Sequence, residues 1–310
     1  VWYCITYEYT NKDKTYFMHL SDRCKFHVTE QRTWSEKYKL CAGKLQSPIA
    51  IKSLKATSVP LPALEMVRYH NSLPGKLLLR NSGHSVLIHP CLCTVALTFH
   101  GDPKERDVPY IFGGVFDRNK TYEMDHIHFH WGSQNIKGSE HTLNGIRFPM
   151  EMHILHINQK YKTFQHALNF QDGLAVLGVF FQQEDNPVLN PILKALPEVR
   201  VLHKEVQLNA SIVLSQLMPE NTDSYYAYKG SLTTPPCSEV VTWVIFPKPV
   251  PISFRQMCKF RSVSGNQGRL VNNYRKLQDV GTRKVYSRLW NPGMKMQYNM
   301  SLLNSTLIWF

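Results

Sequence analysis

The segment DHIHFHW at residues 125–131 constrains the fold more strongly than any other part of the sequence. Histidine alternates there with apolar residues, and side chains on a β-strand point alternately to its two faces. We therefore expect a strand that directs His126, His128 and His130 to one face and the apolar side chains between them to the other.

The segment EMHILH at residues 151–156 shows a similar but less regular alternation. On a strand, Glu151, His153 and Leu155 would share one face. If this strand pairs with the strand at 125–131, three imidazoles converge on one point.

Three convergent imidazoles are typical of a catalytic zinc site. Zinc is bound tetrahedrally, and three protein ligands leave its fourth position open for water. Neutral ligands leave the full charge of the ion to act on that water and lower its pKa toward neutrality. A lone buried histidine is more often a hydrogen-bonded core residue, so the prediction depends on the third histidine on the neighbouring strand.

Short apolar or alternating runs separated by glycine, proline and asparagine indicate a β-rich fold. These runs are 76–80, 85–89, 94–99, 175–181 and 240–246. Two helices are expected, at 190–195 and 253–260, and the second opens on the capping residue Ser253. The pattern predicts a mainly β (α+β) single domain with a few peripheral helices.

We expect three parts along the chain. Residues 1–33 are polar and aromatic with little periodicity and are predicted to form an N-terminal extension, residues 34–290 the domain, and residues 291–310 a C-terminal tail. The chain begins at Val1 without a basic-then-apolar leader, so we expect a mature form or a fragment.

The composition suits a folded globule, with 43% hydrophobic and 19% charged residues. No run of about 18 apolar residues occurs, so no membrane span is predicted. The formal net charge is +13, which would attract polyanions such as acidic glycans or matrix. Because the basic residues are dispersed, a nucleic-acid-binding site is not expected.

Seven cysteines and four Asn-x-Ser/Thr sequons favour an oxidising, glycosylating route, and hence a secreted, extracellular glycoprotein. The sequons lie at Asn119, Asn209, Asn299 and Asn304. The odd cysteine count leaves at least one thiol unpaired or paired outside the chain.

Several motifs, in residue type and order, resemble the α-class carbonic anhydrases of the secreted type. They are HFHWG at 128–132, GSEHT at 138–142, E-x-H at 151–153, QSPI at 46–49, SGH at 82–84, GLAVLG at 173–178 and GSLTTPP at 230–236. The resemblance covers residues 34–288. It implies a single domain built on a large, twisted, mostly antiparallel sheet with a zinc cleft. It also implies reversible hydration of carbon dioxide to bicarbonate and a proton by a zinc-bound hydroxide.

The resemblance assigns the metal ligands and the catalytic residues. His128, His130 and His153 would bind Zn²⁺. Thr233 would accept a hydrogen bond from the zinc-bound hydroxide and donate its own proton to Glu140, which orients the hydroxide toward carbon dioxide.

The resemblance also assigns a proton shuttle and a substrate site. His84 matches the shuttle, because an imidazole with a pKa near neutrality can carry a proton between the metal-bound water and solvent. The substrate-binding residues would be Leu155, Val176, Leu232, Thr234 and Trp243.

The same resemblance assigns hydrogen-bond partners to the metal-binding histidines. Such partners fix which ring nitrogen binds the metal. Glu151 matches the acceptor for the free N–H of His153, and the backbone near Asn273 matches that for His130.

The sequence departs from the family at the partner of His128. His126 stands where the family usually carries glutamine, and we expect neutral His126 to accept the hydrogen bond from His128. Two further departures concern proton transfer: residues 24–27 replace the usual Trp-x-Tyr, and Leu87 replaces a polar cleft residue. We therefore expect slower or differently routed proton transfer.

The cysteines divide into three groups, of which the resemblance assigns only the first. Cys41 and Cys237 match the disulfide of secreted members. Cys4 and Cys24 are expected to pair within the extension. The remaining cysteines are expected to be free: Cys91, Cys93 and Cys258.

Three other functions fit part of the pattern. A binding module with this fold and little catalysis would attach to anionic matrix, glycan or mineral, but such modules typically lack one or more metal histidines. A metallohydrolase would need a second metal or an arginine-rich phosphate clamp. A structural zinc site would need a fourth protein ligand, and His126 lies too close along the strand to His128.

Overall fold

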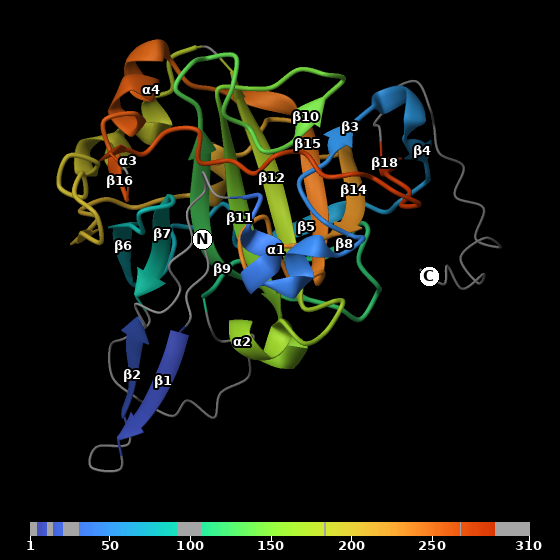
Figure 1. The fold of residues 1–310 in the computed structure, drawn as a ribbon, viewed down its shortest axis with the longest axis horizontal. Helices are drawn as coiled ribbons and strands as arrows, with labels where there is room; N and C mark the ends of the chain where they lie inside the picture. Colours follow the sequence, from blue (N-terminus) through green and yellow to red (C-terminus); the bar gives the residue numbers. More distant parts are fainter. Residues whose placement is uncertain are drawn as a thin grey trace.

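The structure is a computed structural model, and it describes residues 5–10, 15–20, 31–91, 107–182, 184–266 and 268–288. A twisted sheet of twelve strands runs through the molecule (Figure 1). Its strands are β4 (Thr57–Ser58), β5 (Leu64–Val67), β6 (Lys76–Asn81), β7 (Val86–Cys91), β8 (Tyr110–Gly113), β9 (Tyr122–Trp131), β11 (Met150–Asn158), β12 (Leu174–Gln182), β13 (Glu205–Gln207), β14 (Tyr225–Gly230), β15 (Val241–Pro251) and β18 (Tyr286–Arg288).

The strand order places β9 and β11 near the middle of the sheet. Along the main path it is β13-β6-β7-β9-β11-β12-β15-β14-β18-β4, and β5 joins through β8, which pairs with β9. Only β12–β15 and β18–β4 pair in parallel in the described part of this sheet, so the expected mostly antiparallel, mainly β fold is confirmed. The predicted strands at 76–80, 85–89, 175–181 and 240–246 correspond to β6, β7, β12 and β15. The one predicted at 94–99 lies outside the described residues.

Three smaller sheets have two strands each. They are β1 (Ile5–Thr10) with β2 (Thr15–Leu20), β3 (Ala50–Ile51) with β10 (Thr142–Leu143), and β16 (Ser264–Gly265) with β17 (Gly268–Arg269). The first lies within the predicted extension, where the sequence showed little periodicity, and its two strands pair locally from Ile5 opposite Leu20. Residues 21–30 and the predicted tail at 291–310 lie outside the described residues.

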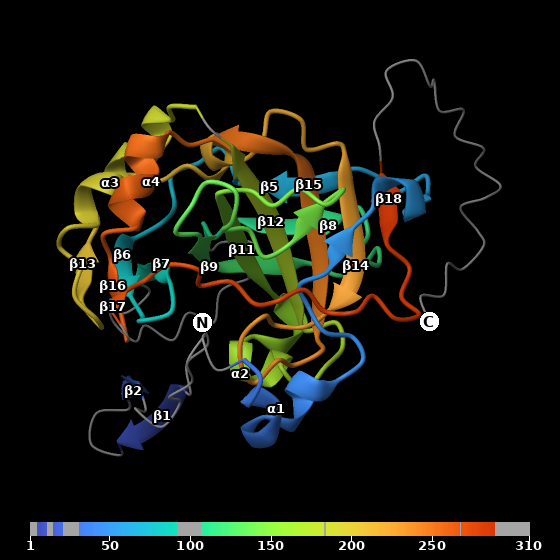
Figure 2. The ribbon, with the colours of Figure 1, turned by 45° about the horizontal axis from the view of Figure 1, so that its top comes forward.

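Short helices lie around the sheet (Figures 1 and 2). The α-helices are α1 (Trp34–Lys37), α2 (Phe164–Ala167), α3 (Asn190–Ala195) and α4 (Phe254–Phe260), and the 3₁₀ helices are η2 (Lys39–Ala42), η3 (Ser53–Lys55), η5 (Gln159–Tyr161), η6 (Pro187–Leu189) and η7 (Leu214–Leu217). The helices predicted at 190–195 and 253–260 are confirmed as α3 and α4. Ser253 caps α4 reciprocally with Gln256, because each side chain accepts a hydrogen bond from the other residue's backbone N–H. None of the helices among these residues is long and apolar enough to cross a membrane.

The central strands are buried on both faces. On one face Ile127 and Phe129 of β9 pack with Ile154 of β11 in the larger hydrophobic cluster. On the other face a smaller cluster contains Leu155 of β11 and Val176 of β12. Polar residues of the second face are therefore enclosed by protein.

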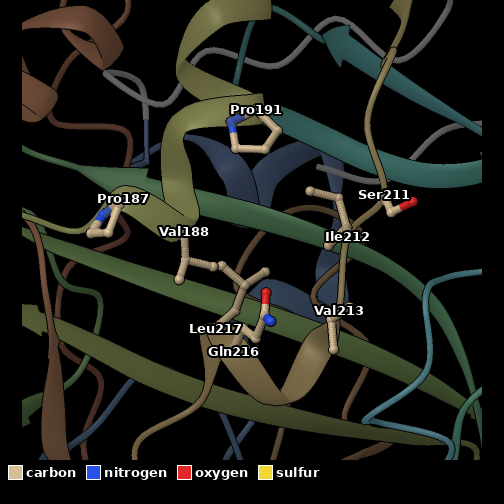
Figure 3. A pocket seen from close by; sticks show the side chains of 8 residues that line it. All are labelled: Pro187, Val188, Pro191, Ser211, Ile212, Val213, Gln216 and Leu217. Atoms are coloured by element: carbon tan, nitrogen blue, oxygen red, sulfur yellow. The ribbon is translucent and has the colours of Figure 1, made fainter.

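A pocket of about 230 Å³ opens on the surface at η6 and η7 (Figure 3). Residues of two segments, 187–191 and 211–217, line it, and most of them are apolar. None of the predicted site residues contributes to its wall. The histidines described next form a separate site.

Candidate metal centre

The pairing of β9 with β11 brings the predicted ligand histidines together. The strands are antiparallel, with His153 directly opposite His128 and Glu151 opposite His130. Directly opposed residues on such strands have Cβ atoms about 4.5–5.5 Å apart. The three imidazoles are almost fully buried.

The ring nitrogens have the spacing of a metal site. Nε2 of His128 lies 3.2 Å from Nδ1 of His153. Two nitrogens that each lie 2.0–2.1 Å from a tetrahedral zinc ion are about 3.3 Å apart. Nε2 of His130 is buried and has no hydrogen-bond partner among the described residues. One nitrogen from each ring lies within 4.8 Å of the others, so the donor set fits a metal ion.

Burial keeps the imidazoles of His128 and His130 neutral. It lowers the pKa of His130 to about 4, and burial together with the neighbouring histidines lowers the pKa of His128 well below its usual value. Near neutral pH both rings therefore carry a free nitrogen lone pair, as metal binding requires.

Two of the ligand rings are held at their other nitrogen by a hydrogen-bond acceptor. Nε2 of His153 donates to Oε1 of Glu151 at 2.7 Å. Nδ1 of His130 donates to the carbonyl of Asn273 at 2.8 Å. Partners of this kind fix the tautomer and orientation of a metal-binding imidazole. In both rings the second nitrogen is left for the metal.

The third ligand ring has an imidazole as its partner. Nδ1 of His128 lies 3.0 Å from Nε2 of His126. On the far side of the His126 ring, Nδ1 lies 2.6 Å from the carboxylate of Asp125. Burial lowers the pKa of His126, which favours the neutral ring as a hydrogen-bond acceptor.

Glu151 belongs to a larger buried network that the sequence did not indicate. Its carboxylate accepts hydrogen bonds from the backbone and the ring of His141, at 2.8 and 2.7 Å, besides the one from His153. The other nitrogen of His141 lies 2.7 Å from the hydroxyl of Tyr228, which donates to Ser47 at 2.9 Å. Burial alone raises the pKa of Glu151, but His141 and His153 outweigh it and hold this pKa well below its usual value. His141 and Ser47 stand in the quoted motifs, and only the folded arrangement joins them.

Gly178 of β12 makes room for this network. It lies directly opposite His153 on the neighbouring strand. A Cβ atom there would lie 2.5 Å from Cδ1 of Ile245 and 3.2 Å from Oε1 of Glu151. The absence of a side chain therefore lets the carboxylate of Glu151 lie against the ring of His153.

Glu140 and Thr233 are both buried. Oε1 of Glu140 accepts a hydrogen bond from the backbone of Arg275 at 2.7 Å, and its Oε2 is buried with no partner among the described residues. The same carboxylate lies 3.6 Å from Nδ1 of His130, so it stands beside the predicted metal ligands. The hydrogen bond from Thr233 to Glu140 stays a prediction.

His84 lies in the turn between β6 and β7, and only 9% of it is exposed. The side chain of Asn273 donates to the His84 carbonyl at 2.9 Å, while the Asn273 carbonyl accepts the N–H of His130. Asn273 thus fixes the His84 turn beside the ligand histidines. Leu87, on the following strand, pairs with His128. The shuttle role of His84 stays a prediction.

The predicted apolar wall for carbon dioxide gathers in one place. Leu155, Val176, Leu232 and Trp243 all belong to the smaller hydrophobic cluster. The Trp243 ring meets that of His153 edge-on, with centroids 4.8 Å apart. Thr234 is buried as well. The wall therefore adjoins a predicted metal ligand.

Cys41 and Cys237 form a disulfide across a sequence separation of 196 residues. It packs against Trp34 and ties η2 to the segment that follows Thr233. Cys258 is free and exposed. The expected pairing of Cys4 with Cys24 lies outside the described residues, as do the Cys93 thiol and residues 24–27.

Comparisons with known proteins agree with this geometry. The profile of the family described as eukaryotic-type carbonic anhydrase matches residues 29–289. The chain is 34% identical to carbonic anhydrase 6 of Canis lupus familiaris over 90% of its own length and 84% of that protein. It is 37% identical to carbonic anhydrase 7 of Homo sapiens over 81% of its length and 91% of that protein. With carbonic anhydrase 12 of Homo sapiens it shares 34% identity over 83% of its length and 70% of that protein. The chain therefore belongs to the eukaryotic-type carbonic anhydrases, the zinc-dependent enzymes that hydrate carbon dioxide.

Proposed function

We propose that His128, His130 and His153 bind zinc and that the chain uses it to convert carbon dioxide reversibly to bicarbonate and a proton. Three buried imidazoles with nitrogens within 4.8 Å of one another are the observation that carries this proposal. When bound, a zinc ion with such ligands lowers the pKa of a coordinated water to about 7 and supplies hydroxide, as known for carbonic anhydrase.

Thr233 and Glu140 orient the attacking oxygen in this proposal. One oxygen of Glu140 accepts a hydrogen bond from the backbone N–H of Arg275, and the other is available to accept a hydrogen bond from the Thr233 hydroxyl. If Thr233 donates to Glu140, its oxygen can only accept a hydrogen bond from the nucleophile. Such orientation supplies part of the rate enhancement by positioning.

The apolar wall holds carbon dioxide, which carries no net charge and gains little from polar contacts. Leu155, Val176 and Leu232 are almost fully buried, and Trp243 closes the cluster beside His153. Exclusion of water from this wall favours a small apolar substrate over competing polar molecules. Thr234, next to Thr233, is the polar residue of the same substrate site.

His84 transfers the product proton toward solvent. Its backbone is tied through Asn273 to His130, which keeps the shuttle residue near the reacting atoms. Leu87 stands where many relatives have a polar cleft residue, so the expected proton route from the reacting atoms to His84 has one polar group fewer. We therefore expect proton transfer to limit turnover.

We also propose that the protein is secreted. The disulfide between Cys41 and Cys237 is of a kind that persists mainly in oxidising compartments. The sequon residues Asn119 and Asn209 are exposed, as glycan attachment requires, whereas Asn299 and Asn304 lie outside the described residues.

The initial rate of carbon dioxide hydration by the zinc-loaded protein tests the proposed function. The wild type is compared with His128→Ala and with His70→Ala, a control that removes an exposed histidine. A fast rate in the wild type and in the control, lost in His128→Ala, is the expected result. No rate above background, with one equivalent of zinc bound, would favour the binding-module alternative instead.

A further inference from the structure

The pairing of β9 with β11 is interrupted at Asp125. His126 faces Leu155, and the next pair along the strands joins Met124 to His156, so Asp125 has no opposite residue on β11. This is a β-bulge, in which two residues of one strand oppose one residue of the other. Bulges are frequent next to active sites, where they redirect a side chain.

The bulge changes which residues of β9 share a face. Tyr122 and Met124 belong to the same core cluster as Ile127 and Phe129. In a regular strand the even-numbered and the odd-numbered residues would point to opposite faces. Asp125 and His126 therefore both turn away from this core. In a regular strand, adjacent residues point to opposite faces, and the Asp125 carboxylate could not reach the neighbouring imidazole.

The contacts of Asp125 determine the tautomers of two rings. A carboxylate can only accept, so the His126 nitrogen 2.6 Å away, Nδ1, carries the proton. Nε2 of neutral His126 then has a lone pair and accepts the Nδ1–H of His128 at 3.0 Å. This leaves the lone pair of His128 on Nε2, the nitrogen that lies 3.2 Å from Nδ1 of His153.

We infer that Asp125 is a positioning residue: its carboxylate, redirected by the bulge, selects the tautomer of His126 and through it presents Nε2 of His128 to the metal. The inference rests on the proposed role of His128 as a zinc ligand. If His126 carried its proton on Nε2, this N–H would face the Nδ1–H of His128, and His128 could accept it only by moving its own proton to Nε2, the nitrogen meant for the metal.

Two substitutions at Asp125 test whether its carboxylate selects the tautomer of His126. One control, at another carboxylate of β9, shows whether loss of any carboxylate from this strand has the same effect. Asp125→Leu removes the acceptor, and Asp125→Asn keeps an acceptor oxygen without its charge. Glu123→Leu removes another partly exposed carboxylate of β9, one that accepts from Gln159 at 3.0 Å. The zinc dissociation constant is measured by competition with a chelator. Side-chain ¹H–¹⁵N correlation spectra of ¹⁵N-histidine protein, with and without zinc, give the tautomer of His126.

The expected wild-type spectrum shows His126 protonated at Nδ1. Asp125→Leu is expected to shift His126 toward the Nε2–H form and to weaken zinc binding roughly tenfold, the lower end for loss of a partner of a metal-binding imidazole. Asp125→Asn should retain the tautomer and weaken binding less. Glu123→Leu should change neither quantity.

Three results would overturn the inference. They are an Nε2–H tautomer of His126 in the wild type, an unchanged tautomer and zinc affinity in Asp125→Leu, and an equal loss of affinity in Glu123→Leu. Failure of the wild type to bind one equivalent of zinc would refute the proposed function as well. The zinc-free spectra would still establish whether Asp125 selects the tautomer of His126.

Discussion

The two faces of β9 and β11 are both largely buried, and they differ in chemistry. One face carries Ile127, Phe129 and Ile154 into the larger hydrophobic cluster. The other carries the predicted ligand histidines and Glu151. Hydrogen bonds join His153 to Glu151 and His130 to the Asn273 carbonyl, while Nε2 of His130 has no hydrogen-bond partner among the described residues. The first face is held by many apolar contacts, and the second by a small number of specific hydrogen bonds. Burial therefore stabilises the domain on one face and positions the chemistry on the other.

The comparison is tested most strongly by removing a ligand. His153→Ala should weaken zinc binding by at least on the order of a thousandfold, because one of three protein ligands is lost. Activity should disappear with the metal. Equilibrium dialysis with zinc gives the affinity, and circular dichroism of the zinc-free protein checks that the fold persists. Retention of stoichiometric zinc with wild-type affinity would contradict the ligand assignment.

Ile154, next to His153 but on the opposite face of β11, should affect stability and not zinc binding. Ile154→Ala should lower the free energy of unfolding by about 2–5 kcal/mol, because it leaves a cavity in the larger cluster. The zinc dissociation constant of the folded protein should stay close to that of the wild type. Urea unfolding with the disulfide intact and chelator competition measure the two quantities. A large loss of zinc affinity with unchanged stability would break the distinction between the faces.

Glu151→Gln tests whether the partners on the histidine face are irreplaceable. The glutamine oxygen can accept from only part of the set that Glu151 satisfies at His141 and His153, and it carries no charge. Zinc affinity should fall about 10- to 100-fold. The control is Glu65→Gln, which neutralises an exposed carboxylate on β5 and should leave the affinity unchanged.

His156 gives a smaller, pH-dependent test, because it is a histidine directed to the core side of β11. It pairs with Ala175 of the larger cluster, and its Nε2 lies 2.6 Å from the Tyr69 hydroxyl. Burial lowers its pKa to about 3, against about 6.5 in the unfolded chain. As the pH falls from about 7 to about 5, only the unfolded state takes up this proton, so stability decreases by about 2 kcal/mol.

His156→Gln removes this titration and keeps an acceptor for Tyr69. The variant should therefore lose about 2 kcal/mol less than the wild type over the same pH interval. Urea unfolding of the zinc-free proteins at both pH values provides the measurement, and the loss in the wild type should end below about pH 3. Equal pH dependence of the two proteins would show that His156 takes up its proton over the same pH range in the folded and unfolded states, and would contradict the lowered pKa.

The sequence predicted the alternating face of His126, His128 and His130, the β-rich single domain and both of the helices named from it. These features follow from local periodicity and from a capping residue. The bulge at Asp125 was not predicted, because a bulge is defined by the pairing of β9 with β11, and that pairing does not follow from the residues of one strand alone. The links from Glu151 to Tyr228 and Ser47 join residues far apart in the chain, so they too depend on the folded sheet.

Gly178 gives the site a property that no scan by truncation would reveal. Alanine scanning removes atoms at nearly every position, but at Gly178 it would add one carbon against Ile245 and the Glu151 carboxylate. The added atom would press on Glu151, the partner of His153, and would reach only ordinary van der Waals distance, 3.9 Å, from Cδ2 of His153 itself. Redesign of the enzyme for tighter or looser metal retention can thus begin at Gly178, where the size of an added side chain changes the space available to Glu151.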